Sequence, residues 1–125
     1  MQLKPHVDVP FQRGPALAPP DALVSWLNQQ GRRLVRLPVI ILVEQPGRVR
    51  NARLGDVAIA LDDSALGISL ADHVRRSCPG APTCHVWLEG LWDPSTPETP
   101  TLQLRRFVRA VSAGEAADFV EVEAQ

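Results

Sequence analysis

The residues whose type and spacing point most directly to chemistry are two cysteines, Cys78 and Cys84. They bracket the stretch PGAPT, whose prolines and glycine allow the chain to return on itself. A disulfide between them would join the end of a predicted helix to the start of the next predicted strand. We therefore predict a Cys78–Cys84 disulfide. In a reducing compartment the alternative is two half-buried free thiols that pack as small apolar groups.

Two histidines flank these cysteines and complete a set of side chains that zinc accepts, namely His73, Cys78, Cys84 and His85. The spacing does not favour a shared ion. His73 precedes Cys78 by five positions on the predicted helix, so the two side chains point in different directions around it. His85 must point away from Cys84 if both lie in one strand. The sequence predicts no metal and no cofactor.

Arginines gather in the middle and near the end of the chain, and a basic groove for single-stranded nucleic acid is one interpretation of them. The candidate binding residues are Arg48, Arg50 and Arg53, after the first long apolar run, and Arg105 in the last one. A net charge of −1, the absence of Tyr and an aromatic content of 5% disfavour this interpretation, because such binding stacks bases on aromatic rings. Solvated surface arginines are the simpler interpretation.

Trp87 is the predicted anchor for a protein or a small ligand. It shares one face of a predicted strand with His85 and Glu89, opposite Val86 and Leu88. An exposed tryptophan is a usual contact in an interface. The alternative is that the N-terminal arm or helix covers it.

Motifs typical of catalysis are missing from the sequence. Asp62-Asp63-Ser64 is not followed by the glycine and glutamate of a calcium loop. Glu89 and Asp93 are four positions apart, with no neighbouring base or nucleophile in the sequence. We therefore predict that the protein is not an enzyme, and an enzyme with an unrecognised site ranks third among the alternatives.

The elements that would position these residues are short and separated by proline and glycine. Residues 1–20 hold five prolines and predict an extended arm, and residues 21–125 predict a single domain. Apolar spacing predicts a helix from Asp21 to Gly31. After it we predict strands at 34–44, 56–61, 66–69, 84–92 and 102–111, a polar loop at 46–55, and a short final strand at 119–122.

Two local signals add detail to this series. Ser69 followed by Asp72 resembles a capping box, so a second helix should begin after Ser69 and end at Cys78. The alternation of apolar residues shifts parity at Phe107, which predicts a β-bulge near Arg105 and Arg106.

A helix between the third and fourth strands resembles the OB-fold, a five-stranded Greek-key β-barrel, over about residues 33–111. The resemblance lies in the order of elements, and a mixed α+β sandwich has the same order. The fold class we predict is mostly β, an OB-like barrel with one helix before it and one inside it. The resemblance implies that ligands bind at the loop after the first strand and on the middle strands.

The longest apolar run, Leu37 to Val43, is too short to cross a bilayer, so we predict no membrane span. The first residues lack a basic region followed by an apolar one, so we expect no signal peptide, and a cytosolic protein or an exported one with a new initiator Met would fit this expectation. The disulfide favours the periplasm or secretion. We expect a non-enzymatic binding module whose partner is a protein or small ligand, contacted through Trp87 or the 46–55 loop. A single-stranded nucleic-acid binder is the alternative, and the oligomeric state stays open.

Overall fold

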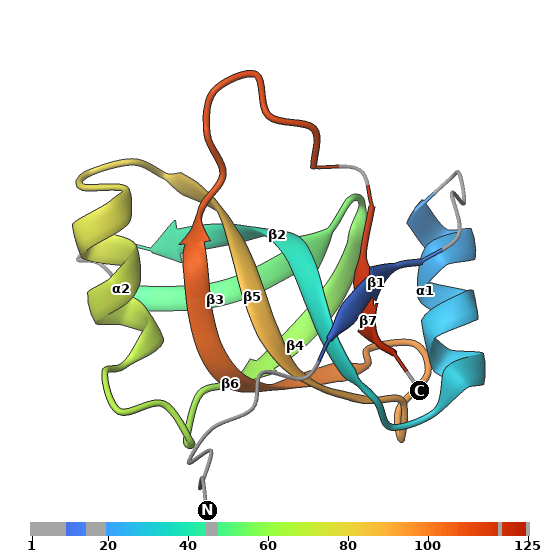
Figure 1. The fold of residues 1–125 in the computed structure, drawn as a ribbon. Helices are drawn as coiled ribbons and strands as arrows, with labels where there is room; N and C mark the ends of the chain where they lie inside the picture. Colours follow the sequence, from blue (N-terminus) through green and yellow to red (C-terminus); the bar gives the residue numbers. More distant parts are fainter. Residues whose placement is uncertain (1–9, 15–19, 45–47, 118, 125) are drawn as a thin grey trace, which may run out of the picture.

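The structure is a computed structural model that describes residues 10–14, 20–44, 48–117 and 119–124. In this part of the chain the protein is mostly β, as predicted, with seven strands and two helices (Figure 1). The elements are β1 (Phe11–Arg13), α1 (Pro20–Gln30), β2 (Leu34–Glu44), β3 (Arg48–Leu54), β4 (Val57–Asp62), α2 (Leu70–Ser77), β5 (Thr83–Asp93), β6 (Thr101–Ala110) and β7 (Glu121–Glu123).

The strands form one sheet in the order β1-β7-β2-β3-β4-β6-β5, and β5 also pairs with β2. The pairings therefore run from β2 through β3, β4, β6 and β5 back to β2. All of them are antiparallel except β4 with β6, which is parallel. Pro38 lies where β2 has left β7 and not yet met β3, which is the edge-like position expected for a residue without a backbone N–H.

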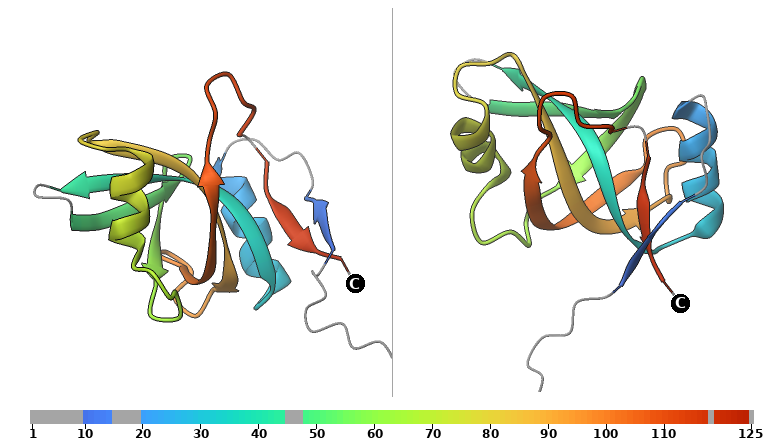
Figure 2. Two further views of the ribbon diagram at one scale, coloured as in Figure 1. Left: turned by 60° about the vertical axis from the view of Figure 1, so that its left-hand side comes forward. Right: turned by 45° about the horizontal axis from the view of Figure 1, so that its top comes forward.

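The core is built by the alternation of side chains along the strands. Every second residue of β5 from Cys84 to Trp92 is buried, as are Leu102 and Leu104 of β6. The helices lie at opposite ends of this core (Figures 1 and 2). Their buried residues are Leu23, Val24 and Leu27 of α1 and Leu70 and Val74 of α2. None of the described helices is long and apolar enough to cross a bilayer.

Both predicted helices are confirmed. The second begins at the predicted cap, because the hydroxyl of Ser69 accepts a hydrogen bond of 3.2 Å from the backbone N–H of Asp72. In the first, Asn28 links the helix to the core by accepting a hydrogen bond of 2.9 Å from Nε1 of the fully buried Trp92.

Two predicted segments are wrong. The stretch 46–55, predicted as a loop, contains strand β3, whose apolar alternation is broken by a register shift opposite Leu42 and Val43. The stretch 66–69, predicted as a strand, pairs with no strand among the described residues, and a backbone hydrogen bond from Leu66 to Asp63 makes a turn there. The predicted order of three strands, a helix and two strands is found from β2 to β6. The second and third of these strands are β3 and β4, whereas the prediction placed them at 56–61 and 66–69.

The end of the predicted N-terminal arm joins the sheet. Residues 11–13 form β1 and pair with β7, the predicted final strand, which runs from Glu121 to Glu123. The guanidinium of Arg36 lies 3.9 Å from the centre of the Phe11 ring and fixes this strand to β2. The rest of the predicted arm, apart from Pro10, Gly14 and Pro20, lies outside the described residues.

Candidate functional site

A β-bulge in β6 sets the geometry of the candidate site. Gly90 of β5 pairs with Leu104 and the preceding Glu89 pairs with Arg106, so Arg105 has no residue opposite it. This confirms the bulge predicted near Arg105. Bulges often redirect a side chain near a functional site.

The bulge depends on a glycine in the neighbouring strand. A Cβ atom at position 90 would overlap the carbonyl oxygen of Gln103 and lie 3.0 Å from the Cα atom of Leu104. Only glycine therefore lets the backbones of β5 and β6 approach this closely.

A cavity of about 330 Å³ lies beside the bulge, and we call it the bulge groove. It opens where β4 leaves the sheet, since β4 runs parallel to β6 only as far as the pair Asp62 and Gln103. The groove is lined by residues of three segments, which are Asp62, Ser64 and Ala65 at and after the end of β4, Leu91 of β5, and Gln103, Leu104 and Arg105 of β6.

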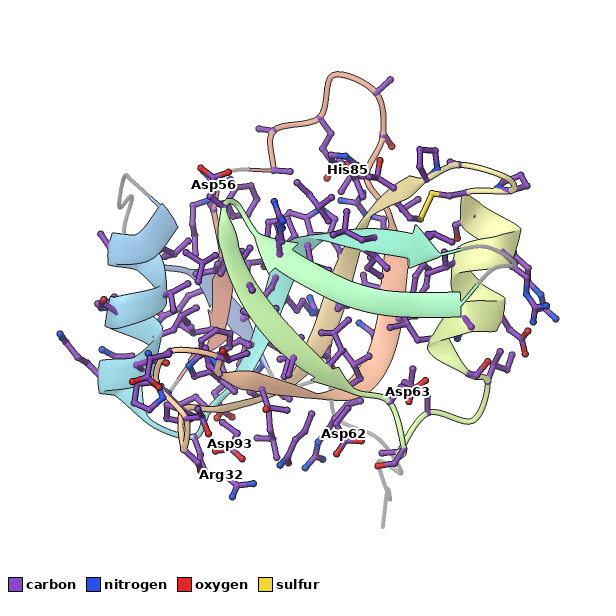
Figure 3. The ribbon with its side chains drawn as sticks, turned by 180° about the vertical axis from the view of Figure 1, so that it is seen from behind. Arg32, Asp56, Asp62, Asp63, His85 and Asp93 are labelled. Carbon is purple, nitrogen blue, oxygen red and sulfur yellow. A yellow bond between two sulfur atoms is a disulfide. The ribbon has the colours of Figure 1, made fainter. Side chains whose placement is uncertain are left out.

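The side chain of Gln103 at the groove is held in place by hydrogen bonds. Nη2 of Arg32 donates to Oε1 of Gln103 over 3.2 Å, and Nε2 of Gln103 lies 3.5 Å from Oδ2 of Asp93. Figure 3 shows Arg32, Asp93 and Asp62 on the same side of the molecule, away from His85. The Gln103 amide is thus oriented between a cation and an anion.

Two carboxylates beside the groove stay ionised at neutral pH. Hydrogen bonds from the hydroxyl and backbone N–H of Ser64 lower the pKa of Asp62 below its ordinary value. The same pair of donors in Ser95 lowers the pKa of Asp93, helped by the charge of Arg32. The groove therefore carries both signs of charge.

Arg105 has no acidic partner among the described residues, unlike the other two arginines of β6. Nη2 of Arg106 lies 3.3 Å from Glu89, and Arg109 binds Glu115 over 2.6 Å. Arg105 is exposed and lines the groove. It is the predicted binding residue that the structure places in a cavity.

Trp87, the predicted exposed anchor, is buried, with 3% of its surface accessible. The apolar alternation of this strand correctly predicted that the Trp87 side chain lies on the face opposite the core. A segment distant in sequence covers it, because Nε1 of Trp87 donates to Glu115 over 2.9 Å and the Phe119 ring lies 5.1 Å away. The expected covering by the N-terminal arm or helix is replaced by this C-terminal segment, and Trp87 is not available as a surface contact.

Glu115 holds the covering segment against the sheet. It accepts two hydrogen bonds from Arg109, one from the backbone of Ser112 and one from Trp87. The bonds from Arg109, and then that from Ser112, lower the pKa of Glu115 to about 2. This cluster has a structural role, since each of its polar groups faces another within it.

Arg53, the predicted arginine of β3 whose side chain is described, is not brought together with Arg105. Arg53 is exposed on β3, and β4 lies between β3 and β6 in the sheet. The side chains of Arg48 and Arg50 lie outside the described part of the structure. These residues belong to strand β3, so the prediction that 46–55 is a loop does not hold for Arg48–Leu54.

The cysteines lie at disulfide-bonding distance, with the Cα atoms of Cys78 and Cys84 5.7 Å apart. The histidines of the zinc alternative point elsewhere. His73 stacks on Phe107 at 4.5 Å between ring centres, and His85 is exposed on β5. In the residues that the structure describes, no three potential metal ligands gather at one place.

Sequence reasoning identified Arg105 and its bulge but missed the other lining residues of the groove. Gly90 in the middle of a strand was the available signal. Comparisons of the chain with protein-family models, with curated proteins and with solved structures found no match.

Proposed function

We propose that the protein is a non-enzymatic binding module that takes a protein or a small ligand in the bulge groove. One observation carries this proposal: Arg105, the bulged residue of β6 and without an acidic partner among the described residues, lines a cavity of about 330 Å³. Ligand sites combine apolar walls with a few fixed polar groups. Leu91 and Ala65 supply apolar surface here, and Gln103 and Asp62 supply oriented polar groups.

We further propose that the five strands linked by pairing are an OB-like barrel. The antiparallel series β2-β3-β4, the helix α2 after it, and the return of β5 to β2 support this assignment. Its two ends would be filled by the buried residues of α1 and α2.

An exported location is also proposed. The Cys78–Cys84 pair supports it, because a disulfide persists in the periplasm or outside the cell and is rare in the cytosol.

A single-stranded nucleic-acid binder is the second candidate, and the exposed Arg53 and Arg105 favour it. The aromatic residues weigh against it. Trp87 and Trp92 are buried, Trp26 packs on the core, and the three Phe rings each face another side chain. All six Trp and Phe residues of the sequence therefore contact other side chains, which reduces the ring surface available for stacking a base.

The test is a screen of small carboxylic acids and short peptides against the ¹⁵N-labelled protein by NMR. Hits should shift the backbone amides of Gln103 to Arg106, and Arg105→Gln should abolish those shifts. Arg76→Gln is the matched control, because Arg76 is also exposed but lies on α2. Hits whose shifts persist in Arg105→Gln, or a screen without hits, would contradict the groove as the binding site.

A further inference from the structure

We infer that the ligand of the bulge groove is an extended peptide segment that adds to β6 as a strand and places a carboxylate against Arg105. This inference rests on the proposed function and names its partner by chemistry. Strand addition to a free sheet edge is a common way to bind peptides, since the main chain supplies affinity and alternate side chains supply specificity.

The free edge lies directly beyond the end of β4. On the side away from β5, β6 pairs with β4 only from Thr101 to Gln103. From Leu104 onward, no described strand pairs on that side, and apart from the pairing with β5 no backbone hydrogen bond from a described segment reaches residues 104–106. A peptide could therefore take the place that β4 has left.

The open stretch is short and bounded at both ends. Asp62 and Ser64 close it where β4 turns away. At the other end, α2 covers β6 through the stacked rings of His73 and Phe107. The bulge groove lies within this stretch, so the site fits the central few residues of a peptide.

The charges at the edge select the side chain of the ligand. Arg106 and Arg109 each have an acidic partner, whereas Arg105 has none among the described residues. Glu89, the partner of Arg106, also pairs with Arg36 over 2.8 Å. A guanidinium binds a carboxylate with two parallel hydrogen bonds. The ionised Asp62 and Asp93 repel a chain of phosphates, which favours a peptide with an isolated acidic residue over a nucleic acid.

The apolar part of the groove suits the same ligand. Leu91 of β5 is half-buried and lines the cavity with Ala65. Side chains alternate along an extended peptide, so an apolar residue beside the acidic one can lie over Leu91 while the carboxylate meets Arg105.

The experiment pans a phage-displayed library of random dodecapeptides against the full chain. Enriched peptides should share an acidic residue with apolar or β-branched neighbours. For one synthetic peptide, Arg105→Gln should weaken binding about tenfold or more, because a hydrogen bond to a charged group is lost. Arg76→Gln should leave the affinity unchanged, and Asp62→Asn should strengthen binding.

The location of the peptide separates strand addition from simple charge recognition. Binding should slow hydrogen exchange of backbone amides in Leu104 to Arg106, and N-methylation of the peptide backbone should weaken binding about tenfold or more. Equal binding of the N-methylated peptide, protection elsewhere, or no enriched peptide would overturn the inference.

These results also distinguish the two proposals. Arginines on an edge strand can serve solely to prevent aggregation, in which case no peptide adds to β6. If small carboxylic acids still shift the groove amides, the inference fails and the proposed function stands. If neither small carboxylic acids nor peptides shift the amides of the groove, both the proposed function and the inference of peptide binding are wrong.

Discussion

Gly90 of β5 lies so close to Gln103 of β6 that a side chain at position 90 would overlap the Gln103 carbonyl oxygen. This contact lies two residues before the bulged residue Arg105 in β6. The position of Arg105, which lines the bulge groove, thus follows a close backbone contact that glycine at position 90 allows.

Gly90→Ala should destabilise the protein by about 1–3 kcal/mol or more, because the added methyl group meets backbone rather than a flexible side chain. Urea unfolding measures the change. Gly67→Ala is the matched control: a Cβ atom at Gly67 has no neighbour within 4 Å, and its φ is not positive. Equal stability of the two variants would show that β5 and β6 are not in close contact at Gly90.

Glu115→Gln should loosen the segment that covers Trp87, and its effect should depend on pH. The pKa of Glu115 is lowered from 4.5 to about 2 in the folded protein. A lowered pKa contributes stability that is complete above 4.5 and is lost as the pH falls through about 2. The difference in urea midpoint between wild type and Glu115→Gln should therefore shrink between pH 4.5 and 2. A difference that stays constant over this range would contradict the role of the ionised carboxylate.

Asn28→Ala should cost about 1–3 kcal/mol of unfolding free energy, because it leaves Nε1–H of the buried Trp92 without its acceptor. Asn28→Asp keeps an acceptor oxygen and should cost less. Thermal or urea unfolding of both variants measures this. If the two variants lose the same stability, the hydrogen bond to Trp92 does not anchor α1.

The double variant Cys78→Ala with Cys84→Ala should lower the unfolding free energy by about 2 kcal/mol, the value expected for closing so short a loop. Intact mass should be two hydrogen atoms lower before reduction than after it. If freshly isolated protein contains two free thiols, both the disulfide and the proposed export are wrong.

Local signals predicted much of the fold. The hydroxyl of Ser69 caps α2 as its spacing from Asp72 indicated, and the parity shift before Phe107 marked the bulge at Arg105. These features depend on residues a few positions apart, so they can be recognised in one sequence.

Features that depend on distant segments could not be predicted. Trp87 lies on the predicted face, but Glu115 and Phe119 cover it from 28 or more positions away. Strand β3 escaped recognition because a bulge breaks its alternation. The groove is lined by segments that are far apart in the sequence, and the parallel pairing of Asp62 with Gln103 brings the end of β4 beside β6.

The central claim is that binding occurs at the bulge groove, and mapping a bound ligand by NMR tests it most directly. With the ¹⁵N-labelled protein saturated by a selected peptide, the shifted amides should lie in residues 62–65 and 103–106, and they should be lost in Arg105→Gln. An oligonucleotide should bind weakly or not at all at physiological salt. Shifts that centre on Arg53 of β3 and fade steeply with rising salt, while the groove amides stay unchanged, would contradict the account and support the nucleic-acid alternative.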